Sequence, residues 1–298
     1  MPVAVLYVTG WCRSGSTVLG NILAEVPGVF HTGELRFLWL NGVLAAGSNR
    51  RCGCGADLLD CPLWSAVLEA GRPAARTLAG HAADVVRWQA ACRTRHTWRV
   101  LREPPGNGWP GTLAATYHAI AAQTGARLIV DSSKFASDAA LLTHLDGIEP
   151  AYVHLVRDPR GVALSWLRPK DYTGRRGVLN STAYWVGFNL AAEAVGAAGR
   201  PAAMRLRYED LTRDPRGSVA RVLTLVGRDA SENPVAADGR AELGPNHTVT
   251  GNPNRFERGS IWLREDRRWR DSLSAPRRAA ATVVALPLMG RYDYTRKF

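Results

Sequence analysis

The 298-residue sequence lacks the features that direct a chain into or across a membrane. No stretch approaches the roughly 18 consecutive apolar residues of a membrane-spanning helix. The N-terminal run MPVAVLYVTG has no basic region, and its apolar stretch is too short for a signal peptide. We therefore expect a cytoplasmic protein that does not have a membrane as a partner.

Cysteine is also scarce, with five residues in the whole chain. A cytoplasmic location favours reduced thiols over disulfides. Cys52, Cys54 and Cys61 nevertheless cluster in CGCGADLLDC, where a zinc site with three thiolates is conceivable. Because no histidine follows at the spacing of a metal ligand, packed thiols or a local disulfide are favoured over a metal ion. The sequence leaves open whether these three thiols are free, bridged or metal-bound.

Acidic residues are in the minority, since 26 Asp and Glu stand against 38 Lys and Arg, a formal net charge of +12. This excess indicates an anionic partner, although a solubilising basic surface would produce the same composition. With 46% hydrophobic residues the chain can bury a substantial core, and its length is near the upper limit for one core. We expect one α/β domain over residues 1–298, with a cysteine-containing helical insertion over residues 47–111.

The first informative motif follows an apolar, β-rich run over residues 4–8. It has the spacing of a P-loop, G-x-x-x-x-G-K-[ST], with Gly10, Gly15 and Thr17 in place. The lysine is missing, because Ser16 stands in its position. In nucleotide hydrolases that lysine reaches the outer phosphates and the next hydroxyl binds magnesium, so an ordinary ATPase loop is not expected.

The same loop is rich in other hydrogen-bond donors. Arg13 supplies a positive charge, and hydroxyls come from Ser14, Ser16 and Thr17. The backbone N–H groups of such a loop and the N-terminus of the following helix suit a phosphate or a sulfate. The loop therefore fits a terminal oxyanion that is less charged than a γ-phosphate and carries no metal.

Three further strand-like runs each end in polar residues before a helical pattern begins, over residues 127–130, 151–156 and 203–207. Repeated strand-to-helix turns predict a P-loop-like parallel sheet flanked by helices, with ligands at the carboxyl edge of the strands. The polar clusters at residues 131–134 and 157–161 should therefore lie near the first loop. Farther along, residues 228–260 read as a long loop, and residues 261–269 and 276–288 as helix.

Arg157 and Ser165 lie eight residues apart, at the end of a strand and two turns along the next helix. A guanidinium can grip a phosphate through two parallel hydrogen bonds while a hydroxyl adds a third. Taken alone, Arg157 is more simply an ion-pair partner of Asp158. Combined with the first loop, it predicts a nucleotide with phosphates at two ends.

This combination resembles the sulfotransferase family that uses 3′-phosphoadenosine 5′-phosphosulfate (PAPS) as sulfuryl donor. In that family an RSG-type loop binds the 5′-phosphosulfate, which the RSGST sequence at residues 13–17 matches. A segment with Arg and Ser eight apart binds the 3′-phosphate, as Arg157 and Ser165 would. Tyr208 in RYEDL matches the tyrosine that approaches the adenine. The product of this cofactor would be adenosine 3′,5′-bisphosphate.

A late segment extends the resemblance over most of the chain. GNPNRF at residues 251–256, with Trp269 beyond it, resembles the C-terminal loop that closes over the 3′ side of the nucleotide. The resemblance makes Arg255 a further phosphate ligand. DSSK at residues 131–134 looks like the VDSSK signature of bacterial members, which implies that Lys134, or a serine beside it, touches the transferring group.

The general base is expected to be Glu34. By itself this residue reads as a helix-start charge. The resemblance is closest to the tyrosylprotein type of the family, in which a glutamate at the spacing of Arg13 to Glu34 serves as general base. Arg36 would orient the acceptor or Glu34. The cytosolic small-phenol branch uses a histidine instead, and this alternative leaves three candidates: His81, His96 and His118.

The chemistry explains these residue types. Sulfuryl transfer builds charge on the bridging oxygen as its bond to sulfur breaks, and Arg13, Lys134 and the loop N–H groups would stabilise that charge. No metal is required. Glu34 would remove the acceptor's proton, for which a partly desolvated carboxylate is a better base than one in water.

The acceptor is expected to be a small molecule, for example a natural product or a sugar. The insertion and the loop near residues 171–180 should shape its pocket. Five tryptophans could line that pocket or belong to the core: Trp39, Trp88, Trp98, Trp109 and Trp185.

Two other functions remain as alternatives. A P-loop small-molecule or nucleoside kinase is one, since residues 128–131 could pass for an acidic, magnesium-binding strand end, although Ser16 argues against it. A basic nucleic-acid-binding protein is the other, although no DNA or RNA module is recognised in the chain.

Overall fold

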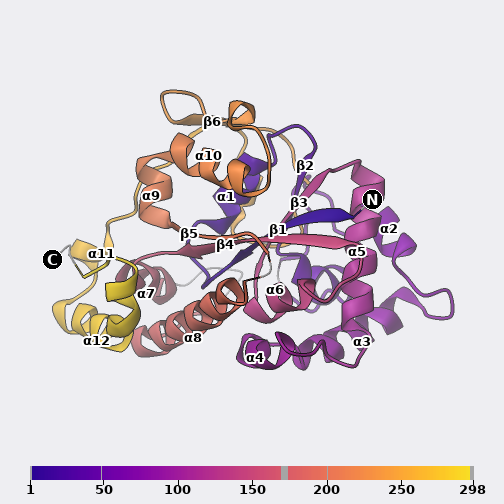
Figure 1. Ribbon diagram of the computed structural model, residues 1–298, viewed down its shortest axis with the longest axis horizontal. Helices are drawn as coiled ribbons and strands as arrows, with labels where there is room; N and C mark the ends of the chain where they lie inside the picture. The colour runs from indigo at the N-terminus through magenta and orange to yellow at the C-terminus, as the bar shows by residue number, and fades with distance from the viewer. Residues whose placement is uncertain (1, 48, 169–173, 200, 296–298) are drawn as a thin grey trace.

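The centre of the molecule is a five-stranded sheet with the strand order β2-β3-β1-β4-β5 (Figure 1). The structure is a computed structural model that describes residues 2–47, 49–168, 174–199 and 201–295. All four neighbouring strand pairs run parallel, which confirms the predicted α/β class. The strands are β1 (Val3–Thr9), β2 (Val29–Gly33), β3 (Leu128–Lys134), β4 (Ile148–Val156) and β5 (Ala203–Arg207).

Helices cover both faces of this sheet (Figure 1). One face carries α1 (Ser16–Leu23) and α10 (Pro215–Leu225), and the other carries α5 (Trp109–Thr124), α6 (Ala136–Leu142) and α8 (Val178–Ala197). Along β1, Leu6 and Val8 pack with the first group, whereas Val5 and Tyr7 pack with the second. Because successive side chains of a strand point to opposite faces, the continuous apolar run of β1 is that of a strand buried on both sides.

Most strands turn directly into a helix at their carboxyl ends. β1 leads to α1, β3 to α6, β4 to α7 (Pro159–Leu167) and β5 to α9 (Tyr208–Arg213). β2 is followed instead by a short 3₁₀ turn, η1 (Leu35–Phe37), and a π-helical segment, η2 (Leu38–Val43). The polar residues at the strand ends therefore gather along one edge of the sheet, as the repeated strand-to-helix pattern predicted.

Residues 47–111, the predicted insertion, hold short helices that pack on the α5 side of the sheet. They are α2 (Pro62–Ala70), α3 (Leu78–Ala90), η3 (Thr94–His96) and α4 (Thr97–Val100). The last residues of this stretch, from Trp109, already belong to α5. The division into one domain with an insertion stays a prediction.

The C-terminal part differs from its prediction. The expected long loop over residues 228–260 contains η4 (Ala230–Glu232), β6 (Arg240–Leu243) and η5 (Pro253–Phe256), and β6 pairs antiparallel with β7 (Gly259–Trp262). The helix expected over residues 261–269 is therefore wrong: residues 261–262 belong to β7, residues 263–267 are irregular, and helix begins only at Trp269. Strands of four residues are too short for a clear alternating pattern. The chain ends with α11 (Trp269–Ser272) and α12 (Ala275–Arg291), and α12 confirms the helix expected over residues 276–288.

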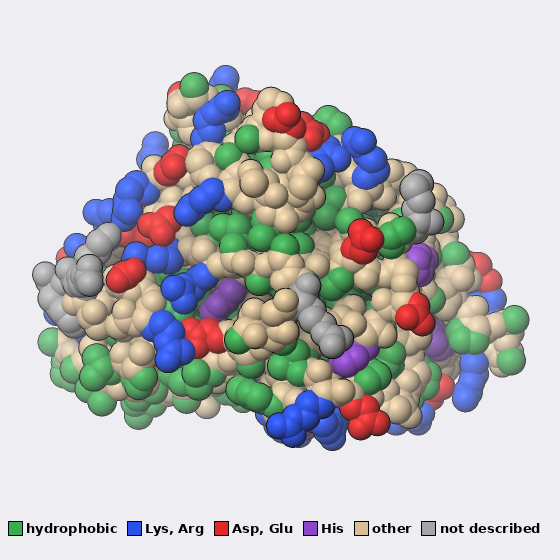
Figure 2. Space-filling view, in the orientation of Figure 1, with side chains coloured by type: hydrophobic (Ala, Val, Ile, Leu, Met, Phe, Trp, Pro, Cys, Tyr) green, Lys and Arg blue, Asp and Glu red, His purple; other side chains and the backbone are tan. Residues whose placement is uncertain are grey.

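Basic side chains are distributed widely over the surface. Figure 2 shows Lys and Arg side chains over several separate parts of one face, with Asp and Glu side chains between them. Among the helices within the described ranges, none is both long enough and apolar enough to cross a membrane.

Candidate active site

A cavity of about 1050 Å³ opens at the carboxyl edge of the sheet. Each of the five strands delivers lining residues to it: the first loop follows β1, Glu34 follows β2, Lys134 ends β3, Arg157 follows β4 and Tyr208 follows β5. Parallel strands end on the same side of a sheet, so residues far apart in sequence meet here. The predicted site residues that line the cavity are Arg13, Gly15, Ser16, Thr17, Glu34, Lys134, Arg157, Ser165 and Tyr208.

Two glycines shape the first loop. Gly10 has a φ of 125°, and a Cβ there would collide with the carbonyl oxygen of Leu155. Gly15 precedes α1 with a φ of 92°, and a Cβ there would lie 3.0 Å from the ring of Tyr208. Only glycine adopts such backbone angles without strain, so both positions of the P-loop spacing are required by the turn and by close packing.

Arg13 extends from this loop with its own backbone in the left-handed region, at a φ of 74°. Its guanidinium carbon lies 4.8 Å from the ring centre of Trp166, a cation–π distance. The hydroxyl of Ser14 donates to the carbonyl oxygen of Trp11 at 2.8 Å, and Ser14 does not line the cavity in the described structure. Ser14 thus stabilises the loop internally, and the hydroxyls that line the cavity here are those of Ser16 and Thr17.

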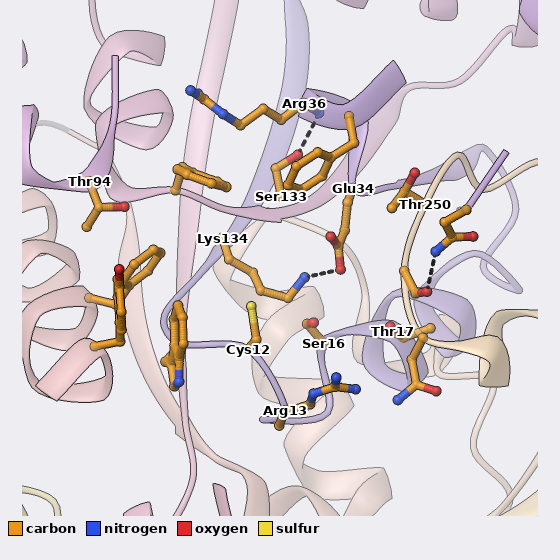
Figure 3. A pocket seen from close by; sticks show the side chains of 18 of the residues that line it. Cys12, Arg13, Ser16, Thr17, Glu34, Arg36, Thr94, Ser133, Lys134 and Thr250 are labelled. Carbon is orange, nitrogen blue, oxygen red and sulfur yellow. Dashed lines mark hydrogen bonds and ion pairs between the residues drawn. The ribbon is translucent and has the colours of Figure 1, made fainter. Parts of the chain in front are cut away.

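Glu34 and Lys134 form an ion pair at the centre of the cavity (Figure 3). The Lys134 ammonium donates to Glu34 Oε1 at 2.5 Å and to the carbonyl oxygen of Ser132 at 2.8 Å. Burial is the largest influence and lowers the pKa of Lys134, but Glu34, Cys12 and Asp131 together outweigh burial and raise that pKa above its ordinary value. The ammonium therefore keeps its charge at neutral pH, beside a carboxylate that faces the cavity.

Arg36 lines the cavity, but its guanidinium does not contact Glu34 in the described structure, so the expectation that it orients Glu34 is not supported. Its guanidinium points away from Glu34 in Figure 3 and binds the Asp138 carboxylate at 2.5 Å. It also donates to the carbonyl oxygens of Gln89 and Cys92 at 2.7 and 2.8 Å. Arg36 thus ties the segment after β2 to α6 and to the end of α3.

Arg157 lies next to the first loop. Its Nη1 donates to the carbonyl oxygen of Arg13 at 3.0 Å, and its guanidinium stacks 4.3 Å above the ring of Tyr208. The alternative in which Arg157 simply pairs with Asp158 is wrong, because Asp158 pairs with Arg160 at 2.7 Å. The two predicted anion-binding arginines therefore lie side by side.

A carboxylate from the C-terminal segment contacts Arg157. Asp266 Oδ2 lies 3.3 Å from Arg157 Nη2, and Arg268 binds the same carboxylate at 2.7 and 2.8 Å. Hydrogen bonds from Arg268, with the charge of Arg157, hold the pKa of Asp266 well below its usual range. Asp266 is thus an anion in contact with two guanidinium groups that line the cavity.

Arg255 does not line the cavity within the described structure. Its guanidinium donates to Thr248 O at 3.0 Å, to Asn49 Oδ1 at 2.8 Å and to Arg51 O at 2.6 Å. Only 1% of the residue is exposed. It joins the C-terminal segment to the start of the insertion, so we do not keep it among the proposed nucleotide ligands.

The alternative histidine bases lie elsewhere. His81 packs edge-on against Trp39 at 5.0 Å, His96 accepts from the backbone N–H of Arg93, and His118 is exposed on α5. None of these three described residues lines the cavity. Of the candidate bases, only Glu34 reaches it.

An aromatic wall faces the ion pair, and the sequence did not indicate it. Three rings pack around Trp11. The centre of the Trp11 ring lies 5.6 Å from that of Trp166, 5.2 Å from that of Tyr184 and 4.5 Å from that of Phe188. Phe188 in turn contacts Phe135 at 5.8 Å. Trp11 and Trp166 lie beside motif residues 13 and 165, and this adjacency was the available signal.

The five tryptophans considered as pocket residues do not line the cavity of the described structure. Trp39, Trp109 and Trp185 are at most 2% exposed in the core, whereas Trp98 is half exposed. The insertion contributes Gly47, Asn49, Val86, Gln89, Ala90 and residues 93–95 to the lining. Of the loop near residues 171–180, residues 171–173 lie outside the described part of the chain, and Arg176 lines the cavity.

The solved structures that share this architecture include two sulfotransferase domains. The sulfotransferase domain of the Synechococcus PCC 7002 olefin synthase matches with a TM-score of 0.54 and 21% identity, covering 97% of this chain and 94% of that one. The sulfotransferase domain from the curacin biosynthetic pathway matches with a TM-score of 0.54 and 16% identity, covering 97% and 98%. At these identities the likeness shows the fold alone.

Sequence comparisons complete the assignment. A search of curated proteins found no match. The model of the sulfotransferase family matches residues 6–232, which span the first loop, the ion pair, Arg157 and Tyr208. This match extends over more than half of the sequence, and the chain therefore belongs to the sulfotransferase family.

Proposed function

We propose that this sulfotransferase uses PAPS as donor and transfers the sulfuryl group to a hydroxyl or amine of a small molecule. The observation that carries the proposal is the contact between Arg13 and Arg157, two arginines that follow separate strands. Arg157 donates to the backbone carbonyl of Arg13, and both residues line one cavity. A nucleotide with phosphates at both ends of one adenosine has the charge distribution for such a pair.

The lining residues fit this donor. The glycine-turned loop and the start of α1 offer N–H groups and the Ser16 and Thr17 hydroxyls to the phosphosulfate. Arg157 and Ser165 would hold the 3′-phosphate, and Tyr208 would lie against the adenine. Asp266 already contacts Arg157 as an anion, so a 3′-phosphate would take the place of that carboxylate.

Lys134 is suited to act on the transferring group. An ammonium has three N–H donors, of which one binds Glu34 and one binds Ser132 O, and the third is left for the transferring group. PAPS supplies a sulfuryl group on a good leaving phosphate. Arg13 and Lys134 would stabilise the charge that develops on the bridging oxygen, without a metal ion.

Glu34 would serve as general base. It is the carboxylate paired with Lys134, and both its Oε1 and the Thr17 hydroxyl lie within 4 Å of the place that a Cβ on Gly251 would occupy. An acceptor hydroxyl or amine between Glu34 and the sulfuryl group would lose its proton to Oε1 or Oε2 during in-line attack.

The acceptor would have an apolar or aromatic body. The wall around Trp11, Phe135 and Phe188 offers ring faces and edges close to Lys134. Such walls bind flat apolar groups through offset or edge-to-face stacking. We propose an aromatic natural product or a similar small molecule.

The kinase alternative is disfavoured by Asp131 as well as by Ser16. Its carboxylate accepts from the Ser133 N–H at 2.8 Å and from the Tyr117 hydroxyl at 2.7 Å. Burial raises the pKa of Asp131 to about 6, as for a carboxyl enclosed in the core. A magnesium-binding aspartate needs a carboxylate that faces the phosphates.

Thermal-shift titration separates these functions. We expect adenosine 3′,5′-bisphosphate without metal to stabilise the protein more than ATP with magnesium, and PAPS to support sulfation of a panel of hydroxylated aromatic compounds. Stabilisation by ATP and magnesium alone would contradict the proposal. Binding to oligonucleotides that falls steeply with salt, without nucleotide stabilisation, would favour the nucleic-acid alternative.

A further inference from the structure

Four potential metal ligands meet outside the cavity. The Sγ atoms of Cys52, Cys54 and Cys61 and a ring nitrogen of His247 all lie within 4.8 Å of one another. The three cysteines come from the insertion, whereas His247 comes from the segment between β6 and η5. His247 supplies the histidine that the neighbouring sequence lacks, from 186 residues beyond Cys61.

The separations match those of one tetrahedral ion. Zinc bonds of about 2.3 Å to sulfur and about 2.0 Å to nitrogen require S···S distances of about 3.8 Å and S···N distances of about 3.6 Å. The Sγ atoms of Cys54 and Cys61 are 3.9 Å apart, and His247 Nδ1 lies 3.6 Å from Cys52 Sγ and 3.2 Å from Cys61 Sγ. A disulfide would need about 2.05 Å between two sulfur atoms.

We propose that Cys52, Cys54, Cys61 and His247 Nδ1 bind one zinc ion. Three thiolates and one imidazole are a ligand set typical of structural zinc. Because the four protein ligands complete the tetrahedron, the ion would have a structural role and no part in sulfuryl transfer.

The backbone holds the cysteines in place without the ion. The N–H of Cys52 donates to Ala56 O at 2.8 Å, and the N–H of Gly55 donates back to Cys52 O at 2.9 Å, which closes a tight turn around Cys54. Gly55 has a φ of 99°, an angle that favours glycine. Cys61 follows at the N-cap of α2. The turn therefore positions Cys52 and Cys54, and the start of α2 positions Cys61.

The histidine is held by separate contacts. The carbonyl oxygen of His247 accepts from Trp64 Nε1 at 2.6 Å, and Thr248 O accepts from the N–H of Gly53 at 2.9 Å. A Cβ on Gly53 would collide with the side-chain oxygen of Asn246. The turn of the insertion and the histidine segment therefore pack in direct contact.

Neighbouring positive charge favours the thiolates. Three thiolates and one divalent ion carry a net charge of −1. Arg258 donates to Gly53 O and Arg255 to Arg51 O, each at 2.6 Å, so two guanidinium groups bind the backbone of the cysteine turn.

The ion would anchor one side of the cavity. Two residues after His247, the N–H of Val249 donates to Thr32 O at 2.8 Å, and Thr250 O accepts from the N–H of Glu34 at 3.1 Å. Gly251 O accepts from Asn49 Nδ2 at 2.8 Å. Zinc at His247 would thus hold the segment that binds the backbone of Glu34.

Metal analysis of the intact protein tests the proposal. We expect about one zinc per chain after purification under reducing conditions, and release of that zinc when the thiols are modified. Cys61→Ser and His247→Ala should lose most of the zinc. Cys92→Ser, a buried thiol that contacts Asp138 at 3.5 Å, should keep it, as should the exposed control His118→Asn.

Two measurements keep the proposal falsifiable if the ligand variants fail to fold. Cobalt substituted into the unaltered protein should show thiolate-to-metal absorption and tetrahedral ligand-field bands, and zinc should protect Cys52, Cys54 and Cys61 from alkylation. Zinc well below one per chain, stoichiometric iron in its place, or a Cys54–Cys61 disulfide in the native protein would each overturn the proposal. None of these outcomes bears on the donor, because nucleotide binding is measured separately.

Discussion

Two walls of the cavity are built in different ways. The loop wall, residues 11–13 and 15–17 with Arg157 and Tyr208, consists of residues at or just after strand ends. The clamp wall, Glu34 with Asn49, Thr250 and Gly251, is joined by contacts such as that between Asn49 and Gly251, 202 residues apart. Hydrogen bonding within the sheet fixes the loop wall. The clamp wall forms only when segments distant in sequence come together, and closing the long loops between them costs conformational entropy.

This difference implies different sensitivities. A substitution in the loop wall should lower turnover while leaving the stability of the fold unchanged, because the strands hold the backbone. A change in the clamp wall should alter the position of Glu34 through its neighbours and affect stability as well. The following predictions test that contrast.

Arg13→Ala should have the largest effect on activity. We expect turnover to fall by about a thousandfold, the upper range for losing one donor to a developing oxyanion, with weaker binding of adenosine 3′,5′-bisphosphate. Steady-state kinetics and calorimetry measure the two effects. Arg87→Ala on α3, where the side chain is 73% exposed, is the control. Near-normal turnover would show that the loop wall does not bind the transferring group.

Glu34→Gln should lower turnover by roughly a hundredfold, the usual contribution of general-base catalysis, while nucleotide affinity stays nearly constant. The amide keeps the shape of the side chain but cannot accept a proton at neutral pH. Glu149→Gln, an exposed position on β4, is the matched control. Unchanged turnover would assign the proton transfer to another group.

Gly251→Ala should lower kcat/KM by about tenfold through the added methyl group. Gly251 has a φ of 146°, and a Cβ there would lie 3.5 Å from Thr17 Oγ1 and 3.9 Å from Glu34 Oε1. Gly259→Ala also forces a residue with a side chain into a positive φ, 75°, but has open space around it. Both variants should lose about 1–2 kcal/mol of stability, and only Gly251→Ala should lose activity. Equal activities would show that Gly251 does not border the reaction.

Removing the proposed zinc should affect the clamp wall more than the loop wall. We expect the melting temperature to fall by roughly 5 °C, because losing about 2 kcal/mol of unfolding free energy lowers it by that amount in a chain of this size. Turnover should drop severalfold, while the affinity for adenosine 3′,5′-bisphosphate stays within about threefold, since Arg13 and Arg157 depend on the sheet. A larger loss of nucleotide affinity than of turnover would contradict the contrast between the walls.

Asp266→Asn should give the smallest effect, and it should strengthen nucleotide binding where the other substitutions weaken binding or activity. Removing the carboxylate frees Arg157 and Arg268 for a phosphate, so nucleotide binding should tighten by roughly threefold, in keeping with the small energy of partly exposed ion pairs. Asp271→Asn on α11 is the control. Weaker binding would indicate that Asp266 positions Arg157 for the nucleotide.

Sequence reasoning succeeded where structure depends on neighbours in the chain. The P-loop spacing predicted the turn at Gly10 and Gly15, and repeated strand-to-helix patterns predicted the parallel sheet. It failed where a partner had to be chosen among several. Asp158 stands next to Arg157 but pairs with Arg160, and Arg36 stands near Glu34 but binds Asp138. Which partner is chosen depends on side-chain direction, which proximity in sequence does not specify.

The edge at which Arg13, Lys134 and Arg157 meet was already implicit in the order of residues, because parallel strands end on a common side whatever connects them. The aromatic wall and the approach of His247 to the cysteines were not. Metal ligands and stacked rings must lie within a few ångströms of one another. For Cys61 and His247, which are 186 residues apart in the chain, only the packing of the two segments sets that distance.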